Sequence, residues 1–241
     1  MKLSEARVLV TGGGSGIGRA TARLLVQNGA KVALIGRDAA RLRMTASEVG
    51  AVAIPGDVRD EGDVKRFVAA AIRELGDLNV LVNNAGIGTF APLVETSAED
   101  FRRVWETNTL GAMLVGRECA RHFLTRKAQG LESGGNIVNI GSTAAQRGFA
   151  GGSTYCASKF ALTALTECWR AELRGSDVRV MQVNPSEVQN EFGEHAGRPA
   201  RKSVNPTKLV SEDIAHVIVS LLSLDDRGFV TDAAVWATNP R

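Results

Sequence analysis

Size, composition and charge exclude several classes of protein. The chain has 241 residues, of which 44% are hydrophobic and 23% are charged, and its formal net charge is +3. This composition is typical of a folded domain and excludes extensive disorder. The Lys and Arg residues are spread along the chain rather than clustered, which argues against binding to nucleic acid. We expect a single domain that spans residues 1–241.

The sequence indicates neither a membrane nor a metal as a partner. No apolar stretch approaches the roughly 20 residues that cross a bilayer, and the first residues lead directly into a strand pattern without a signal peptide. Cys119, Cys156 and Cys168 form no CxxC pair and have no histidine at metal-ligand spacing. We therefore expect a cytoplasmic protein, in a reducing compartment, with no metal site.

Apolar runs of strand length alternate with segments of helical periodicity. Strands are predicted at Arg7–Val10, Lys31–Ile35, Val52–Ile54, Asn79–Val82, Gly135–Ile140, Val178–Val183 and Phe229–Val230. Helices are predicted from Ile17 to Asn28, after Asp38, and at Glu61–Leu75, Ala98–Ala128, Thr154–Leu173 and Ser211–Leu222. This alternation is typical of a doubly wound α/β (Rossmann) fold, in which helices cover both faces of a mostly parallel sheet. We predict seven strands in the order 3-2-1-4-5-6-7.

A few residues mark where these elements begin or break. Asp38 and Ser211 are expected to cap the helices that follow them. The helix predicted at Ala98–Ala128 is expected to break or bend near Asn108. Between residues 186 and 210 the periodicity fades into Gly, Pro and charged residues, which predicts a long loop that covers the substrate.

A glycine-rich turn joins the first predicted strand to the first helix. Residues 11–18 read Thr-Gly-Gly-Gly-Ser-Gly-Ile-Gly. Glycines let the backbone approach a pyrophosphate closely, and the free N–H groups at the start of a helix bind its charge. The turn therefore predicts a dinucleotide site, although glycines also occur in strand-to-helix turns for geometry alone.

The end of the second strand bears on the choice of dinucleotide. Enzymes that use NAD place an acidic residue there to bind the ribose 2′-hydroxyl, and such a residue would repel a 2′-phosphate. This chain has Gly36 followed by Arg37. A guanidinium suits phosphate oxygens, so the sequence favours NADP(H) over NAD(H). The alternative is that Arg37 is a solvated charge beside Asp38.

Tyr155 and Lys159 are the first candidates for chemistry. Tyr155 is the only tyrosine, and Lys159 follows it by four residues, which places both side chains on one face of a helix. A phenol has a pKa of about 10, too high for efficient proton transfer at neutral pH, and a neighbouring cation lowers it. The alternative is a surface tyrosine beside a charge, since such pairs arise by chance in many helices.

Polar residues follow neighbouring strands of the predicted sheet. Ser142 comes directly after the fifth strand, and Asn83–Gly86 reads Asn-Asn-Ala-Gly at the end of the fourth. Asn108 lies in the next helix. Ligands of open parallel sheets bind outside the carboxyl edge, where these residues are expected to meet the tyrosine.

This combination of motifs resembles the short-chain dehydrogenase/reductase family. The resemblance rests on residues 11–18, on Asn83–Gly86, Asn108 and Ser142, on the run Tyr-Cys-Ala-Ser-Lys at 155–159, and on Asn184-Pro185. The motifs occur in the order and spacing of the family and cover essentially the whole chain. Within the family the chain is most similar to 3-oxoacyl-[acyl-carrier-protein] reductase-like members.

The resemblance implies a catalytic tetrad. Tyr155 would be the general acid in reduction and the general base in oxidation. Lys159 would assist it and hold the nicotinamide ribose, Ser142 would bind the substrate oxygen, and Asn108 would anchor a water that links Lys159 to solvent. Hydride addition to a carbonyl leaves oxyanion character, which the serine and tyrosine hydroxyls are suited to stabilise.

The resemblance also implies a set of cofactor contacts. Asp57 would face the adenine amine and Val58 the adenine ring. The full set of expected cofactor-binding residues is Gly12, Ser15, Gly16, Ile17, Gly18, Arg37, Asp57, Val58, Asn84, Ala85, Gly86, Tyr155, Lys159, Pro185 and Val188.

The chain departs from the family pattern in two places. Ser186 stands where the family has Gly in Asn-Pro-Gly, and Asn190 stands in place of a threonine near the nicotinamide amide. The loop geometry there is expected to differ, while Asn190 keeps its hydrogen-bonding ability. The C-terminal run also lacks the usual glycines, and Trp236 is expected either at a subunit contact or in the core.

These observations predict an oxidoreductase that transfers a hydride between NADP(H) and a carbonyl or secondary alcohol, either a ketone reductase or a 3-oxoacyl reductase. Its partner is expected to be a small molecule, with a carrier-bound acyl chain among the candidates. The resemblance implies a homotetramer or homodimer built through the long helices. Two alternatives stay open: an NAD-dependent alcohol or sugar dehydrogenase, and a catalytically idle nucleotide-binding regulator.

Overall fold

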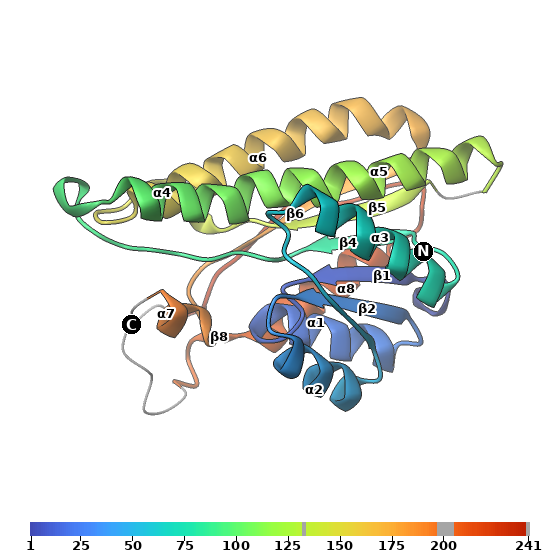
Figure 1. The fold of residues 1–241 in the computed structure, drawn as a ribbon, viewed down its shortest axis with the longest axis horizontal. Helices are drawn as coiled ribbons and strands as arrows, with labels where there is room; N and C mark the ends of the chain where they lie inside the picture. The colour runs from blue at the N-terminus through green and yellow to red at the C-terminus, as the bar shows by residue number, and fades with distance from the viewer. Residues whose placement is uncertain (132–133, 197–204, 240–241) are drawn as a thin grey trace.

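The core of the protein is one parallel sheet. The computed structural model describes residues 1–131, 134–196 and 205–239. Seven strands lie in the order β3-β2-β1-β4-β5-β6-β9, all parallel (Figure 1). Their bounds are Arg7–Thr11 (β1), Lys31–Gly36 (β2), Val52–Pro55 (β3), Val80–Asn83 (β4), Gly135–Ile140 (β5), Val178–Pro185 (β6) and Asp232–Val235 (β9). The predicted strand order and the doubly wound α/β class are confirmed.

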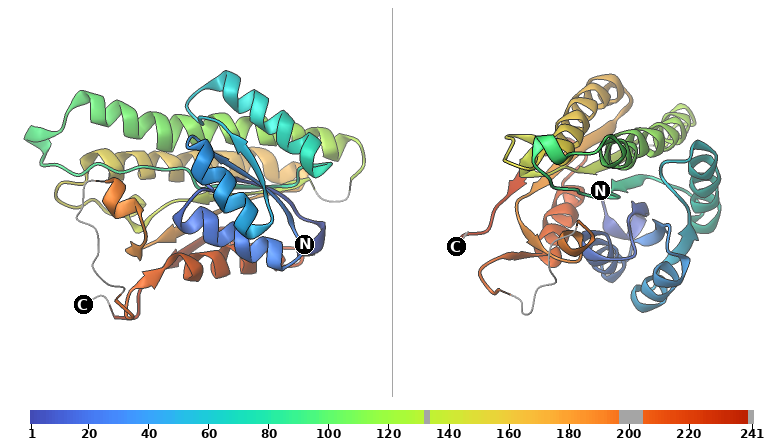
Figure 2. Two further views of the ribbon diagram at one scale, coloured as in Figure 1. Left: turned by 60° about the horizontal axis from the view of Figure 1, so that its bottom comes forward. Right: turned by 60° about the vertical axis from the view of Figure 1, so that its left-hand side comes forward.

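Helices cover both faces of this sheet, as Figure 2 shows. Three cover one face: α1 (Gly16–Gln27), α2 (Ala39–Val49) and α8 (Ser211–Ser223). The other face carries α3 (Glu61–Leu75), α5 (Ala112–Ala128) and α6 (Ser153–Leu173), with α4 (Ala98–Trp105) leading into α5. Among the described residues, no helix is both long and apolar enough to cross a membrane.

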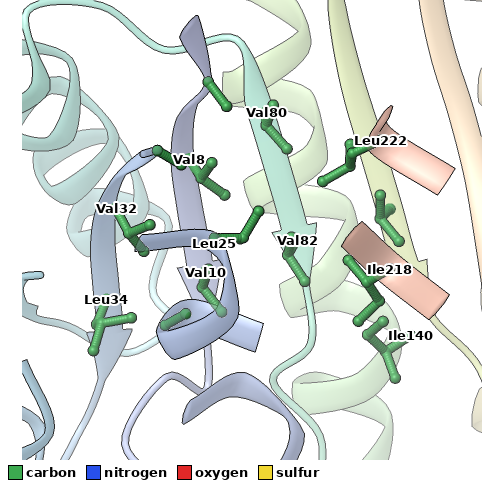
Figure 3. Packing of buried hydrophobic residues seen from close by; sticks show 14 of the residues in the cluster. Val8, Val10, Leu25, Val32, Leu34, Val80, Val82, Ile140, Ile218 and Leu222 are labelled. Carbon is green, nitrogen blue, oxygen red and sulfur yellow. The ribbon is translucent and has the colours of Figure 1, made fainter. Parts of the chain in front are cut away.

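Alternation along β1 explains why the sheet is covered twice. Successive side chains of a strand point to opposite faces. Val8 and Val10 belong to the apolar cluster beneath α1, α2 and α8, and Leu9 belongs to the cluster beneath α3 and α5. Figure 3 shows the first cluster, where Leu25 of α1 and Ile218 of α8 pack against the strands. A strand buried on both faces needs a continuous apolar run, which is what the sequence shows.

The long helix after β4 is interrupted where the sequence predicts. Residues Glu106–Gly111 form a π-helical segment, η3, between α4 and α5. Its extra residue per turn changes which side chains point inward, and such bulges are frequent at functional sites. Asn108 lies in this segment and is fully buried.

Two local predictions were wrong. The last strand is Asp232–Val235 rather than Phe229–Val230, because the backbone that runs beside β6 begins only where the Thr231 carbonyl accepts a hydrogen bond from the Gln182 amide. The apolar pair before it precedes the paired segment. Prediction from local hydrophobicity cannot locate a pairing that β6 determines.

Ser211 is the first residue of α8 rather than its cap. The cap position is Val210, whose amide donates to the Asp213 carboxylate at 2.9 Å. Asp38 does cap α2, since its carboxylate accepts from the Arg41 amide at 3.0 Å. At α2 the cap side chain accepts from an N–H of the first turn, whereas at α8 the Asp213 carboxylate accepts from the N–H of the cap residue.

The segment predicted as a loop, residues 186–210, contains short regular pieces. β7 (Val188–Gln189) and β8 (Leu209–Val210) pair in parallel, and α7 is Phe192–His195. Residues 197–204 lie outside the described residues.

Candidate active site at the carboxyl edge of the sheet

A cavity of about 940 Å³ opens at the carboxyl ends of β1, β4, β5 and β6. Most of the expected site residues line it, namely Gly12, Ser15, Gly16, Ile17, Asn84, Ala85, Gly86, Ser142, Tyr155, Lys159, Pro185 and Val188. The expected residues that do not line it are Gly18, Arg37, Asp57, Val58 and Asn108. One cavity therefore joins the glycine-rich turn to the tyrosine and the lysine.

The glycine-rich turn needs glycine at specific positions. Gly12 and Gly16 have φ of +64° and +50°, a region that side chains disfavour. A Cβ atom on Gly18 would lie 2.3 Å from the Gly12 carbonyl oxygen, so α1 can start this close to β1 only with glycine there. Gly18 thus shapes the turn from behind without facing the cavity.

The turn is tied to the end of β4 by Thr11 and Asn84. The Thr11 hydroxyl accepts from the amides of Asn84 and Ala85, each at 3.0 Å. The Asn84 side-chain amide donates to the carbonyl oxygens of Thr11 at 2.9 Å and Gly12 at 3.2 Å. The two strand ends therefore form one rigid floor of the cavity.

Lys159 is buried in this floor. Its side chain is 4% exposed, and its ammonium donates to the carbonyl oxygen of Ile140, at the end of β5, at 2.8 Å. The ammonium lies 5.8 Å from the centre of the Tyr155 ring, one helical turn earlier on α6. Burial lowers the pKa of Lys159 to about 8, because desolvation penalises the charged form.

Asn108 is fixed beside Lys159 by three hydrogen bonds. Its amide oxygen accepts from the Ile87 amide at 2.8 Å, and its nitrogen donates to the Ile87 carbonyl at 2.9 Å and to the Ser158 hydroxyl at 3.0 Å. A Cβ atom on Gly86 would lie 3.4 Å from the Asn108 oxygen and 3.6 Å from the Lys159 nitrogen. The two polar groups therefore flank Gly86.

Ser142 is held at the end of β5. Its hydroxyl accepts from the Ala144 amide at 3.1 Å and donates to the Pro185 carbonyl at 3.4 Å. Its own amide donates to the Asn184 side chain at 3.1 Å. These contacts position the hydroxyl on the same cavity wall as Tyr155.

The residues expected at the adenosine end lie outside the cavity. Asp57 accepts three side-chain hydrogen bonds from Arg59, at distances of 2.6 to 3.1 Å. Burial raises the pKa of Asp57, but the hydrogen bonds and charge of Arg59, with the charge of Arg37, outweigh it and lower that pKa overall. Val58 is buried and packs against Gly111. Arg37 is exposed and forms no salt bridge with another described residue.

Comparison with known proteins assigns the family. Residues 6–199 match the family model described as short chain dehydrogenase. The chain belongs to that family. It is therefore an oxidoreductase with the nucleotide-binding fold that these strands and helices form.

Individual relatives of this oxidoreductase differ in substrate. The chain is 36% identical over 193 residues to a sorbitol dehydrogenase of Cereibacter sphaeroides, a match that covers 79% of this chain and 73% of that protein. It is 33% identical over 217 residues to a 3-oxoacyl-[acyl-carrier-protein] reductase of Rattus norvegicus, covering 88% of this chain and 89% of that one. Another curated relative is longer, and the match spans 62% of its length.

Solved structures agree with the fold. The crystal structure of a 3-ketoacyl-(acyl-carrier-protein) reductase from Brucella melitensis, complexed with NADH, superposes with a TM-score of 0.86. The two chains are 30% identical, and the match covers 96% of each.

The oxidoreductase carries its two departures from the family pattern next to the cavity. The Ser186 amide donates to the Val235 carbonyl at 2.8 Å, which extends the pairing of β6 with β9. The Asn190 side chain lies beside Gly16, where a Cβ atom would approach its amide nitrogen to 3.4 Å, and it accepts from the Phe192 amide. Asn190 therefore reaches the glycine-rich turn.

Sequence reasoning missed part of the cavity wall. Phe90, Arg147, Phe149 and Trp236 line it and were not expected there, whereas Phe192, which also lines it, belongs to the segment predicted to cover the substrate. Trp236 is half exposed, so it is not a core residue. The available signal was the placement of Phe90 and Phe149 shortly after β4 and β5, at the same edge as the catalytic motifs. In the described part of the chain, no group of three or more His, Cys, Asp or Glu side chains is placed to hold a metal.

The buried lysine gives a prediction about stability. In the folded protein the pKa of the Lys159 amine is about 8, and in the unfolded chain it is near the usual 10.5. Between these values the unfolded chain binds more protons, so the free energy of unfolding rises with pH. The buried charge lowers the free energy of unfolding by about 3 kcal/mol below pH 8, and this penalty vanishes above pH 10.5.

Lys159→Met should therefore stabilise the protein without dinucleotide by about 2 kcal/mol at pH 7, since the lost hydrogen bond to Ile140 offsets part of the gain. The gain should disappear as pH approaches 10.5. Urea unfolding at pH 7 and pH 10 measures it, with the exposed Lys65→Met as control. A gain that does not change with pH would contradict this assignment.

Proposed function

We propose that this oxidoreductase transfers a hydride between NADP(H) and a carbonyl or secondary alcohol, as a ketone or 3-oxoacyl reductase. The observation that carries the proposal is the pairing of Tyr155 and Lys159 on one face of α6, in a cavity that also contains Ser142 and the glycine-rich turn. A protein that only binds a nucleotide has no chemical need for this set of groups.

The residues present fit a nicotinamide dinucleotide. Gly12 and Gly16 adopt positive φ in the turn, and Gly18 lets α1 start close to β1, so the backbone itself borders the cavity there. The N–H groups at the start of α1 suit a pyrophosphate, since the helix dipole favours negative charge there. When bound, the nicotinamide would supply or accept the hydride. Relatives that contain NADH support this assignment.

Three groups would act on the substrate oxygen. Tyr155 would donate its phenolic proton to the oxygen during reduction and remove it during oxidation. Ser142, fixed by Ala144 and Pro185, would hold the same oxygen with its hydroxyl. The ammonium of Lys159 would stabilise the phenolate that remains after each transfer.

Asn108 would position the path by which Tyr155 regains its proton. Its amide oxygen and the Lys159 ammonium flank Gly86, the one residue there without a side chain to block a water molecule. A water at that point would connect Lys159 to solvent. The π-helical segment places Asn108 at this depth.

Tyr155→Phe tests the chemistry. The variant removes one hydroxyl and keeps the ring that packs against Phe90 and Phe192, so we expect turnover to fall by about 10³-fold or more. Dinucleotide affinity, measured by calorimetry, should stay within a few-fold of wild type. Undiminished turnover would remove Tyr155 from the mechanism. Dinucleotide binding without any turnover in the wild-type protein would instead favour the idle nucleotide-binding regulator.

The preference for NADP(H) rests on Arg37. It is exposed at the end of β2 and forms no salt bridge with another described residue, so its guanidinium is available to a 2′-phosphate. Asp57, whose carboxylate interacts electrostatically with Arg37, is already bound by Arg59 and so repels a phosphate less than a free carboxylate would. Val58 and Asp57 would border the adenine.

Arg37→Ala should weaken NADPH binding by about 10-fold or more and leave NADH binding within about two-fold, because only the 2′-phosphate contact is lost. Titration of both dinucleotides measures the ratio. Arg43→Ala, which removes an exposed arginine from α2, is the matched control. An unchanged NADPH-to-NADH ratio in Arg37→Ala would favour the second candidate function.

That second candidate is an NAD-dependent alcohol or sugar dehydrogenase. The 36% identity to a sorbitol dehydrogenase supports it. The two candidates share Tyr155, Lys159 and Ser142 and differ in the role of Arg37, so the same titration separates them.

We assign the enzyme to the cytoplasm. Cys119, Cys156 and Cys168 are all free thiols, which fits a reducing compartment.

We also propose that the enzyme assembles as a homotetramer or homodimer through α4, α5 and α6. These helices lie side by side on one face of the molecule (Figure 1). Large apolar side chains are exposed on them: Phe101 and Trp105 stack at 6.2 Å, and Phe160 of α6 is 46% exposed. Clustered exposed aromatics of this kind mark an interface.

The double variant Trp105→Glu, Phe160→Glu should dissociate the assembly, because it places two charges in the proposed contact. Sedimentation velocity measures the mass. Met44→Glu, on the exposed side of α2, is the control and should keep the wild-type mass. A wild-type protein that sediments as a monomer would contradict the proposal.

A further inference from the structure

Three phenylalanines beside Tyr155 form what we call the aromatic box: Phe90 and Phe192, which contact the Tyr155 ring, and Phe149, which contacts Phe90. The Phe90 ring packs edge-on to Tyr155 with centres 5.7 Å apart, and Phe192 packs against it at 5.6 Å. Phe149 contacts Phe90 at 6.0 Å. All three line the cavity, and they come from the segments after β4, before α6 and in α7.

Phe90 and Phe192 both pack against Gly88. A Cβ atom on Gly88 would lie 3.0 Å from Phe192 and 3.2 Å from Phe90, so both rings lie directly over a glycine. Aromatic walls favour planar apolar ligands through stacking and buried area. A substrate whose carbonyl meets Tyr155 would place its body against these rings.

Arg147 lines the same cavity, two residues before Phe149. Its guanidinium lies over the Trp236 ring, 5.5 Å from the ring centre, and Trp236 also lines the cavity. No described carboxylate forms a salt bridge with Arg147. The stacking fixes the plane of the guanidinium while its N–H edge stays available for an acceptor.

The charges of the cavity wall do not balance. Its charged residues are Arg147, Lys159, Glu187 and Lys208. Glu187 and Lys208 form a salt bridge with each other at 3.3 Å, and Lys159 is bound to the Ile140 carbonyl beside Tyr155. Arg147 is therefore a cation of the wall without a carboxylate partner among the described residues, and a cavity with an excess of positive charge concentrates anions.

We propose that Arg147 determines substrate class: the enzyme selects carbonyl compounds and alcohols that combine a planar apolar body with an anionic group, a carboxylate or a phosphate. The body fills the aromatic box, and the anion binds the guanidinium held by Trp236. This inference rests on the proposed function, since it concerns the substrate of the same site.

The test compares matched probes that differ in charge: 4-acetylbenzoate, the neutral 4-acetylbenzamide, and 4-acetylphenyl phosphate, with their 3-substituted isomers. We expect kcat/KM for at least one anionic probe to exceed that for the matched amide by about 10-fold or more, as for a charged hydrogen bond. The benzoate and phosphate arms distinguish the two sources of the anion.

Variants assign the preference to one residue. Arg147→Gln should remove the preference and leave kcat/KM for the amide within about three-fold, while Arg147→Lys should restore part of it. Arg227→Gln, an exposed arginine that pairs with Asp225, is the matched control. A preference that survives Arg147→Gln, or that Lys208→Gln removes instead, would overturn the proposal.

Calorimetric binding of the probes to the protein with NADP⁺ gives a readout that does not require turnover. If anionic probes bind more tightly than the amide through Arg147 but none is converted, the anion site stands and the proposed reaction fails for these compounds. If the amide is reduced in a Tyr155-dependent way with no charge preference, the reaction stands and the inference about Arg147 fails. A charge preference seen only with acyl groups on a carrier protein would also overturn it.

Discussion

The hydrogen bond between the buried Lys159 ammonium and the Ile140 carbonyl is the interaction on which the site depends. It joins the N-terminal part of α6 to the end of β5, so the helix that carries Tyr155 is fixed relative to the strand that Ser142 follows. An ammonium this deeply buried is costly, and its pKa falls accordingly. A buried charge that lowers the stability of the fold is expected where the charge serves chemistry rather than folding.

The other supports of the site follow from the same requirement. Helix α6 can approach β5 closely only if the segment before α5 makes room, and the π-helical turn at Glu106–Gly111 does so while it turns Asn108 inward. Asn108 donates a hydrogen bond to the Ser158 hydroxyl, and Thr109 donates one to the Ser158 carbonyl. Ser158 is the chain neighbour of Lys159. Lys159 is therefore fixed by its own hydrogen bond to β5 and by the bonds that η3 makes to its neighbour Ser158.

Local sequence patterns predicted the features that depend only on residues close together in the chain. The alternation of Val8, Leu9 and Val10 sufficed for a doubly covered strand, and Asp38 sufficed for a cap. The last strand could not be located, because its position depends on pairing with β6 across about fifty residues of chain. The cap at Val210 could not be located either, because it depends on the Asp213 carboxylate reaching the Val210 amide.

The candidate site likewise combines features that local sequence predicts with features that depend on distant segments. The spacing of Tyr155 and Lys159 predicts a shared helix face, and the end of each strand predicts a shared edge. The partner of Asp57 follows from the path of the chain after β3, and no spacing rule signals that Arg59 folds back onto it. The aromatic box is built from three distant segments, so no window of sequence contains it.

The proposed reaction and the proposed substrate preference depend on different parts of the fold. The groups proposed for proton transfer lie on or beside strands and long helices, whose positions the packed sheet fixes. Arg147, Phe149, Phe192 and Trp236 lie on connections and a short helix, which can change without disturbing that core. Relatives about 35% identical carry names as different as sorbitol dehydrogenase and 3-oxoacyl reductase, so one fold in this family serves different substrates. The sheet therefore specifies the reaction, and the substrate has to be inferred from the side chains that the connections bring to the cavity.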